Sequence, residues 1–425
     1  MRGKILYLFL VLSLFSFHVF SQDTAYLKKH IINLSSEKFL GRGYVNKGVN
    51  KAAKYLAKEM QNIGLKNFNK SYFQKLDYSV NTFPGKISLE IDGKKLINGE
   101  DFFIGPASPK INQEYEIVNF DSITLADTIR FMAKAVSLKL SDKLVVIDFS
   151  VLTDSDVRWF YIHLMRHNYI NAGGYIELND GNLAWAVRNY QQNIPSLKIK
   201  KSSWNTNYNK VKLKLKPKFI EKYNTENVIG YIEGEKDEYI VICGHYDHLG
   251  SMGNKVFTPG ANDNASGTSA VLDFARYYAK NKPKYNILFA CFTGEEAGLR
   301  GSTYFADNPL IPLDKIKLVV NFDMIGTGEE GATIVNGAVE AYADITNKFL
   351  EINERNKYLN TLNLRGEARN SDHYPFHAKG VKAVFFYTMG AETYYHSPKD
   401  VIDNMSFAGY EGLFKLVRDF IAEYE

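Results

Sequence analysis

Apolar residues in the second half of the chain form four short continuous runs, at residues 239–243, 287–292, 318–322 and 383–386. Runs of this kind are typical of strands that are buried on both faces of a sheet. Between the first two runs, residues 267–280 place apolar side chains at helical spacing. Strands that alternate with helices predict an α/β fold, in which a mostly parallel sheet carries helices on both faces.

The chain between residues 72 and 197 has a different texture. Short strands are predicted there at 87–91, 95–97, 144–147 and 175–178, with helical patterning between them. An amphipathic helix over residues 49–63 precedes this stretch. We therefore expect residues 72–197 to form an inserted domain of mixed β/α structure, and residues 22–71 and 198–425 to form one domain around it.

The first residues have the pattern of a secretory signal peptide. Arg2 and Lys4 precede an apolar run over residues 5–20, and small residues stand at positions −3 and −1 of a cut after Ser21. The run is shorter than the roughly 20 residues of a membrane span. We expect residues 1–21 to be removed and the protein to be secreted or periplasmic, with an uncleaved anchor as the alternative.

Composition narrows the class of protein. The 425 residues are 45% hydrophobic and 23% charged, which excludes a disordered chain, a coiled coil and a polytopic membrane protein. The net charge of +5 comes without a basic cluster, so no nucleic-acid partner is expected. Cys243 and Cys291 both lie in predicted buried strands, and we expect free thiols rather than a disulfide.

Acidic and imidazole side chains follow three predicted strands where each strand ends. His245 and Asp247 follow the first, Glu295 and Glu296 the second, and Asp323 the third. In α/β sheets, ligands bind at the carboxyl ends of the strands. These side chains are therefore expected to converge on one rim of the sheet.

Two loop residues, Asp263 and His396, complete the set. Imidazole and carboxylate together suit zinc, with cobalt or manganese as alternatives. The candidates outnumber the ligands of one catalytic zinc and fit two metals about 3.5–4 Å apart that share a carboxylate. Such a site suits the hydrolysis of a peptide or amide bond. We expect His248 to be an outer or packing group, and His163 and His167 to be a surface pair.

Several motifs carry a resemblance to a known family. They are LSSEKFLGRG at 34–43, GHYDHLG at 244–250, GANDNASG at 260–267, FTGEEAG at 292–298, NFDMIG at 321–326, SDHYPF at 371–376 and YHSPKD at 395–400. The sequence resembles the co-catalytic zinc aminopeptidase family, which includes secreted bacterial leucyl aminopeptidases and, more distantly, glutamate carboxypeptidase II. The middle stretch is similar to the protease-associated insert of many members.

The resemblance implies a role for each residue of the set. His245 and Asp323 would bind one zinc ion, Glu296 and His396 a second, and Asp263 would bridge the two.

Three further roles follow from the resemblance. Glu295 would act as the general base, Asp247 would hydrogen-bond the far nitrogen of His245, and Tyr395 would stabilise the oxyanion.

The function that the resemblance implies is an exported di-zinc exopeptidase that removes N-terminal residues from a peptide substrate. A single-zinc glutaminyl cyclase and a carboxypeptidase or aminoacylase are the alternatives within enzymes. A non-enzymatic binding ectodomain is disfavoured, since every ligand position is filled. The sequence leaves the oligomeric state open.

Overall fold

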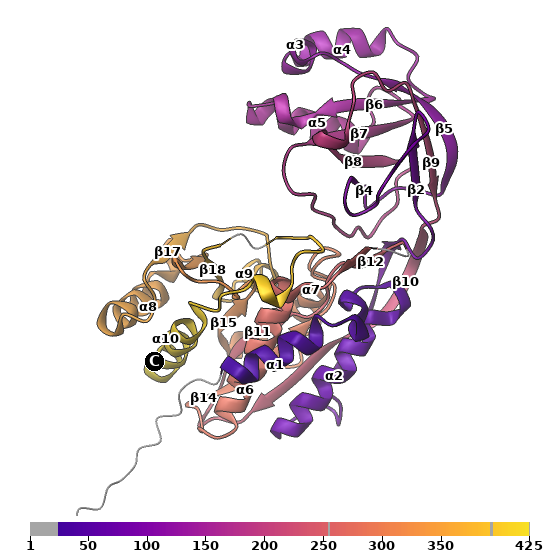
Figure 1. Cartoon of the computed structure of the whole chain (residues 1–425). Coiled ribbons are helices and arrows are strands. Elements are labelled where there is room, and N and C mark those ends of the chain that lie inside the picture. The colour runs from indigo at the N-terminus through magenta and orange to yellow at the C-terminus, as the bar shows by residue number, and fades with distance from the viewer. Residues whose placement is uncertain (1–23, 254–255, 392–393, 425) are drawn as a thin grey trace, which may run out of the picture.

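The computed structural model describes residues 24–253, 256–391 and 394–424, so the predicted signal peptide lies outside the described residues. Figure 1 shows two stacked parts. The lower and larger part contains both ends of the described chain, and the upper part is built from a continuous middle stretch. None of the helices within the described ranges has the length and apolar character of a membrane-spanning segment.

The lower part is built on an eight-stranded sheet. In spatial order its strands are β1 (Phe73–Thr82), β10 (Lys218–Ile232), β14 (Tyr285–Phe292), β11 (Lys236–His245), β15 (Ile316–Phe322), β18 (Ala383–Met389), β16 (Gly331–Val335) and β17 (Leu362–Arg365). The four central strands from β14 to β18 run parallel. β1, β10 and β16 add antiparallel pairs on the two flanks, which the predicted strand pattern did not include.

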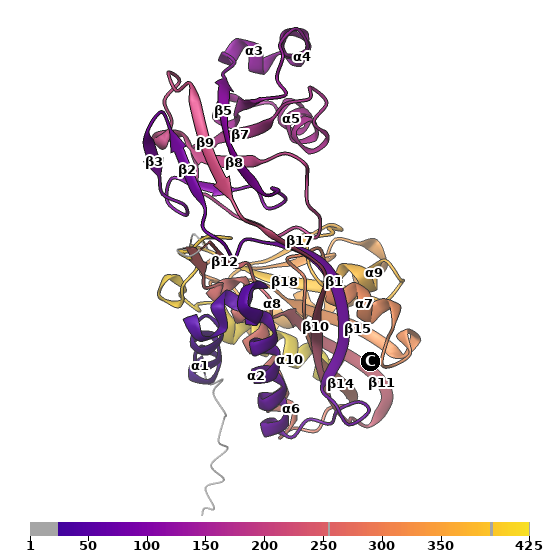
Figure 2. The same ribbon diagram turned by 90° about the vertical axis from the view of Figure 1, so that its right-hand side faces the viewer.

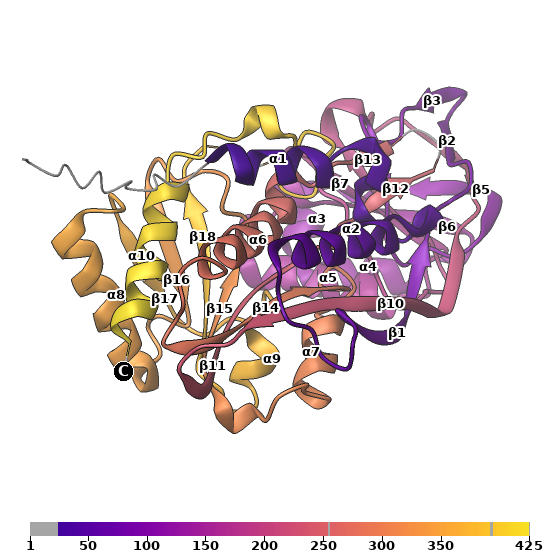
Figure 3. The same ribbon diagram turned by 90° about the horizontal axis from the view of Figure 1, so that it is seen from below.

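Helices cover both faces of this sheet, as predicted (Figure 3). One face carries α1 (Thr24–Leu34), α2 (Gly48–Ile63), α6 (Gly267–Tyr278), α8 (Ala343–Asn356) and α10 (Tyr410–Glu423), and the other carries α7 (Arg300–Asp307) and α9 (Tyr374–His377). Side chains of β11 alternate between the two cores: Ile240 and Ile242 pack on the α6 side, and Val241 and Cys243 on the other. This double burial explains the continuous apolar runs in the sequence.

A glycine sets how closely α6 approaches the sheet. A Cβ atom at Gly267, the first residue of α6, would lie 2.2 Å from the carbonyl oxygen of Phe322. Only glycine permits this approach, which brings the loop before α6 against the carboxyl end of β15.

The upper part is a second eight-stranded sheet with three helices packed on it. Its strands, in spatial order, are β3 (Lys94–Leu96), β2 (Ser88–Ile91), β9 (Lys210–Leu215), β5 (Ile111–Val118), β6 (Lys143–Asp148), β7 (Gly174–Asn179), β8 (Ser196–Lys200) and β4 (Phe102–Ile104). The helices are α3 (Ser122–Ala126), α4 (Thr128–Val136) and α5 (Ser155–His167). The four strands predicted in this stretch all lie in this sheet.

The division of the chain between the two sheets differs from the expected boundaries of 72 and 197. β1 belongs to the lower sheet, where it pairs along its length with β10, and Figure 2 shows the two strands side by side. β9, which follows residue 197, belongs to the upper sheet. The second sheet therefore spans residues 88–215, which we call the insert. A change of sequence texture marks a new strand but does not reveal which sheet the strand joins.

Two smaller expectations are confirmed. Cys243 and Cys291 are buried free thiols on neighbouring strands. His163 and His167 lie exposed on α5, with ring centroids 6.0 Å apart. A short hairpin of β12 (Gly250–Met252) and β13 (Val256–Thr258) follows β11 and completes the strands of the described residues.

Candidate metal centre

Three parallel strands end side by side at one rim of the lower sheet. β11 pairs with β14 and β15, and its last residue, His245, lies level with Phe292. The predicted acidic residues follow directly, so the rim gathers their side chains. Loops bring Asp263 and His396 to the same place.

The structure brings all five predicted metal ligands together. Nε2 of His245 lies 3.4 Å from an oxygen of Asp263 and 3.4 Å from an oxygen of Asp323. Nε2 of His396 lies 3.1 Å from the other oxygen of Asp263 and 3.1 Å from Oε2 of Glu296. The two carboxylate oxygens of Asp263 thus face two separate imidazoles. Among the described residues, two clusters have the spacing of a metal site and share Asp263: one with His245 and Asp323, the other with His248 and Glu296.

Hydrogen bonds fix the orientation of both imidazoles. Nδ1 of His396 donates to the main-chain carbonyl oxygen of Trp185 at 2.7 Å, and Nδ1 of His245 donates to the carbonyl oxygen of Asp247 at 3.1 Å. A carbonyl oxygen only accepts, so each ring carries a proton on Nδ1, which leaves Nε2 as the nitrogen that could bind a metal ion. This is the tautomer that a metal ligand requires.

The side chain of Asp247 differs from its expected role. Its carboxylate lies 3.8 Å from Nδ1 of His245, and the main-chain oxygen of the same residue makes the hydrogen bond. The carboxylate instead accepts hydrogen bonds from the hydroxyl of Tyr44 and from the backbone N–H groups of Glu295 and Glu296. Asp247 therefore holds the turn that carries the two glutamates.

The charge balance of the site favours bound cations. Burial by itself would lower the pKa of His245, but the charges of Asp323 and Glu295 outweigh it and raise the pKa well above its usual value. The pKa of His396 is raised in the same way, against burial, chiefly by Glu296 and Asp263. Clustered buried carboxylates stabilise positive charge, whether protons or metal ions carry it. The donor set, imidazole nitrogen with carboxylate oxygen, fits zinc.

His248 is nearer to the site than the sequence indicated. Its Nδ1 donates to Oε1 of Glu296 at 2.9 Å and lies 3.9 Å from Oδ2 of Asp263. That bond occupies one oxygen of Glu296 and leaves Oε2 facing His396. We interpret His248 as an outer residue that orients Glu296, because His396 already presents a free Nε2 at the same position.

A cavity of about 780 Å³ opens beside the ligands. Glu295 lines it next to His245 and Asp323, and burial, with the charges of Glu296 and Asp323 and against the effect of His245, raises the pKa of Glu295 well above its usual value. Tyr395 also lines the cavity; its side chain is 52% exposed and its ring stacks on His396 at 3.7 Å between centroids. The lining of the cavity also includes four large apolar or aromatic side chains: Met324, Phe385, Tyr387 and Met389.

Three supporting residues had no role in the sequence analysis. Asp400 accepts hydrogen bonds from the backbone N–H groups of Asn262 and Asp263, and the hydroxyl of Ser371 donates to Oδ2 of Asp323 at 2.8 Å. Arg42 is fully buried and donates to main-chain oxygens behind the site. Asp400 and Ser371 belong to motifs that the resemblance had marked, but only their contacts reveal what they hold.

Comparison with known proteins agrees with this geometry. Residues 227–421 match the model of Peptidase family M28, and all five candidate ligands lie within this range. The matched part of the chain, somewhat less than half of its length, is similar to peptidase family M28. The M28 region includes the carboxyl ends of all the central strands, and the predicted resemblance to co-catalytic zinc aminopeptidases is thereby confirmed.

The chain is also similar to individual proteins along more of its length, at low identity. Aminopeptidase YwaD of Bacillus subtilis is 28% identical over 223 residues, which cover 50% of this chain and 48% of YwaD, so the match spans about half of that relative. The crystal structure of BSAP, a zinc aminopeptidase from Bacillus subtilis, is 23% identical, with a TM-score of 0.71 over 95% of both chains. A glutaminyl cyclase of Tannerella forsythia is 12% identical, with a TM-score of 0.53 over 95% of this chain and 100% of its own. The two structures show a shared fold.

Proposed function

We propose that this protein is an exported di-zinc exopeptidase that removes N-terminal residues from peptides. The observation that carries the proposal is the position of Asp263, whose two oxygens face His245 and His396 separately. A carboxylate placed in this way is the shared ligand that a pair of metal ions requires. His245 and Asp323 would hold one zinc ion, and Glu296 and His396 the other.

The residues around the ions would carry out the proton transfers. Two bound zinc ions would polarise the scissile carbonyl and make water acidic enough to attack at neutral pH. Glu295, which lines the cavity beside His245, would accept the proton of the attacking water and deliver it to the leaving amine. The hydroxyl of Tyr395 would donate to the oxygen that becomes negatively charged.

The cavity wall supports a preference for an apolar N-terminal side chain. Met324, Phe385, Tyr387 and Met389 form a wall that a leucine- or methionine-sized group would cover. An exposed carboxylate, Glu330, lies at the same cavity and would tolerate a basic side chain there. The substrate class is therefore a peptide with a large apolar or basic first residue.

The mixed sheet of the insert supports the proposal that it is a protease-associated-like domain. Export is proposed separately, from the signal-peptide pattern of residues 1–21. A fusion of residues 1–40 to a periplasmic reporter would test export. Reporter that remains uncleaved inside the cell would contradict it.

The activity test compares one tripeptide in three forms: free, N-acetylated and C-terminally amidated. Loss of hydrolysis on acetylation alone would support the aminopeptidase proposal. Loss on amidation alone would indicate a carboxypeptidase, and hydrolysis of the acetyl group itself would indicate an aminoacylase.

The glutaminyl cyclase alternative is separated by metal content and by product. Two zinc ions per chain and release of the first amino acid are expected. About one zinc ion per chain, with a pyroglutamyl product from a peptide that begins with glutamine, would replace the proposal with the cyclase.

A further inference from the structure

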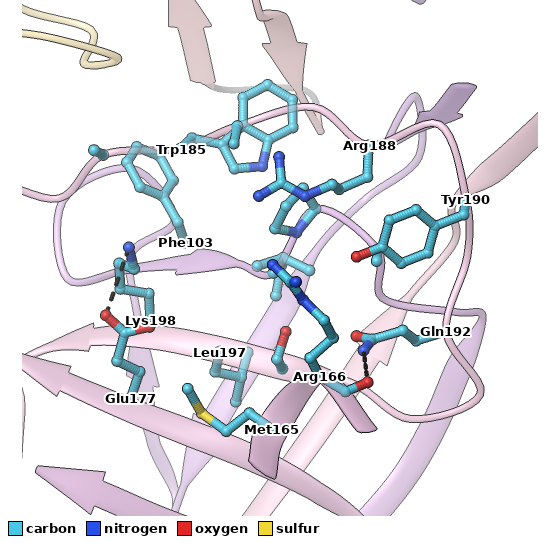
Figure 4. Close-up of a pocket in the computed structure, with 17 residues that line it drawn as sticks. Phe103, Met165, Arg166, Glu177, Trp185, Arg188, Tyr190, Gln192, Leu197 and Lys198 are labelled. Atoms are coloured by element: carbon cyan, nitrogen blue, oxygen red, sulfur yellow. Dashed lines mark hydrogen bonds and ion pairs between the residues drawn. The ribbon is translucent and has the colours of Figure 1, made fainter. Parts of the chain in front are cut away.

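The insert contains a pocket of its own, distinct from the cavity beside the metal ligands. It has a volume of about 290 Å³ and lies between β4, β7, β8, the end of α5 and the segment 184–192 (Figure 4). This volume is near the lower limit of about 300 Å³ for small-molecule sites, which suits a ligand of one amino-acid residue. Nothing in the proposed catalytic reaction uses this pocket.

The polar side chains of the pocket are mainly hydrogen-bond donors. Arg166 and Arg188 project their guanidinium groups into its middle, with Tyr190 and Gln192 beside them (Figure 4). Glu177 is the one carboxylate among the lining residues, and it forms an ion pair with Lys198 at 3.5 Å. The pocket therefore keeps a surplus of two positive charges.

A buried donor points to the same kind of ligand. Trp185 lines the pocket and is 5% exposed, and its Nε1–H has no acceptor within hydrogen-bonding distance among the described residues. In Figure 4 the indole nitrogen lies on the side of the ring that faces Arg188. Buried N–H groups are rarely left unpaired, so this donor calls for an acceptor from outside the chain.

The remaining wall is apolar, with Phe103, Met165 and Leu197 around the charged centre. We propose that the insert binds an organic carboxylate that carries an apolar side chain. The two guanidinium groups and the indole N–H would bind the carboxylate, since arginine matches its two oxygens, and the apolar wall would cover the side chain. A free apolar amino acid and the C-terminal residue of a peptide both present this chemistry.

Trp185 links this pocket to the metal centre. Its main-chain carbonyl oxygen accepts from Nδ1 of His396 at 2.7 Å, and its backbone N–H donates to the main-chain carbonyl oxygen of His396 at 3.1 Å. A carboxylate bound to the indole N–H would restrict the motion of Trp185 and so stabilise its two hydrogen bonds with His396. By thermodynamic linkage, zinc bound through His396 would in turn increase the affinity for the carboxylate. This coupling rests on the proposed function, whereas the binding site itself does not.

The test titrates 4-methylpentanoate into the full zinc-loaded chain and follows binding by calorimetry and by the indole N–H signals of ¹⁵N-labelled tryptophan. This probe has the side chain and carboxylate of leucine but no amino group. The chain has three tryptophans, so Trp185 gives one of three signals. Saturable binding that shifts this signal is expected, and 4-methylpentanamide, which lacks the charge, should bind at least tenfold more weakly.

Variants test the assignment of the two arginines. Arg166→Gln and Arg188→Gln should each weaken binding at least tenfold; both side chains are exposed, so the fold should persist. Arg130→Gln is the matched control, because Arg130 is exposed on α4 of the insert and does not line the pocket. Equal binding of acid and amide, or equal loss in Arg130→Gln, would overturn the proposal.

Two further arms identify the source of the carboxylate and the link to zinc. If an N-acetylated tripeptide acid that ends in leucine binds more tightly than 4-methylpentanoate, the site is assigned to peptide C-termini. If the two bind equally well, the site is assigned to single amino acids. Both outcomes support the carboxylate site. If 4-methylpentanoate still binds after zinc removal, but more weakly, the coupling between the two sites is supported. If its affinity is unchanged, the coupling is overturned. These binding readouts do not depend on peptidase activity, so failure of the proposed function would be recognised separately.

Discussion

The hydroxyl of Tyr44 donates a hydrogen bond of 2.7 Å to Oδ2 of Asp247, and both side chains are buried. Tyr44 comes from the segment before α2, and Asp247 follows β11. The same carboxylate accepts from the backbone N–H groups of Glu295 and Glu296, at 3.1 and 3.3 Å. The N-terminal segment is thus connected through one carboxylate to the turn that carries the proposed base and a proposed zinc ligand.

Tyr44→Phe should lower zinc affinity by about tenfold, because outer hydrogen bonds of this kind contribute about 10- to 100-fold to metal binding. The free energy of unfolding should fall by about 1–3 kcal/mol, since a buried carboxylate oxygen loses the stronger of its two donors. Chelator competition measures the affinity, and urea unfolding measures the stability.

Tyr223→Phe is the control for that variant. Its ring packs on Tyr44 with centroids 5.3 Å apart, but its hydroxyl donates to Asn50 at 3.0 Å. Zinc affinity should therefore stay at the wild-type value. An equal loss of zinc affinity in the two variants would show that packing around Tyr44, and not its bond to Asp247, supports the site.

Glu295→Gln should keep both zinc ions and lose about 10²- to 10⁴-fold in kcat, the range expected for a general base. The change keeps the size of the side chain and removes only its capacity to accept and return a proton. Asp263→Asn is the contrasting variant: it should lose zinc, because both histidine groups share this carboxylate. Zinc content by elemental analysis and kcat on a leucine peptide distinguish the two. A Glu295→Gln enzyme with the wild-type rate would exclude this residue as the base.

Arg42 connects the loop that carries Asp263 to other parts of the chain through hydrogen bonds to main-chain oxygens. Its guanidinium donates to the carbonyl oxygens of five residues, which lie in three separate stretches of the chain: Leu34, Tyr246, Pro259, Gly260 and Asp263. Burial lowers the pKa of Arg42 to about 10, even though the charges of Asp400 and Asp263 raise it, so the group is charged at neutral pH.

Arg42→Lys should therefore lower the free energy of unfolding by about 3–6 kcal/mol, because the three N–H donors of lysine leave at least two of the five carbonyl oxygens without a hydrogen bond to a charged group, at about 1.5–3 kcal/mol each. Lysine keeps the charge but lacks the planar arrangement of five N–H donors. Arg158→Lys is the control: this partly buried arginine of the insert donates to two carbonyl oxygens, Phe149 and Leu152, and its loss should have a smaller effect. Equal losses of stability, measured by urea unfolding, would contradict the special role of Arg42.

The sequence could predict the centre of the fold and the composition of the site for one physical reason. Parallel strands buried on both faces need continuous apolar runs, and their carboxyl ends meet at one rim. The runs that contain Cys243 and Cys291 therefore located β11 and β14, and the acidic residues after them located the candidate ligands.

What could not be predicted depends on contacts between distant parts of the chain. β1 alternates like an insert strand, yet it pairs with β10 from much later in the chain, for example Phe73 with Val228. Trp185 supports His396 through a main-chain carbonyl, which every residue has, so no side-chain pattern marks it. His248 and His245 lie in the same motif, but His248 faces a carboxylate with Nδ1 and His245 with Nε2. Which nitrogen faces the carboxylate depends on the geometry of the turn, which the sequence does not show.

The last prediction concerns stability at mildly acidic pH and involves His30, away from the metal ligands. Its side chain is buried in α1, where Nδ1 lies 2.7 Å from the hydroxyl of Tyr55 and Nε2 has no partner among the described residues. Burial, with the charges of Lys29 and Arg276, lowers the pKa of His30 to about 4. A histidine that the fold keeps neutral stabilises it fully above its unfolded pKa of about 6.5, and this contribution is lost as the pH falls from about 6.5 to about 4.

His30→Gln remains neutral over this range and keeps a group that can bond to Tyr55. From pH 7.5 to pH 5, the free energy of unfolding of the wild type should therefore fall by about 2 kcal/mol relative to that of His30→Gln, given about 1.4 kcal/mol per pKa unit. Urea unfolding of both proteins without zinc, at several pH values, measures this difference and cancels the titration of the metal ligands. A pH-independent difference would mean that His30 is as easily protonated in the folded protein as in the unfolded chain. α1 packs on α6 and on the loop that carries Asp263, so protonation of His30 would weaken the packing of α1 and also destabilise the metal site. On acidification, zinc should therefore dissociate from the wild type at a higher pH than from His30→Gln.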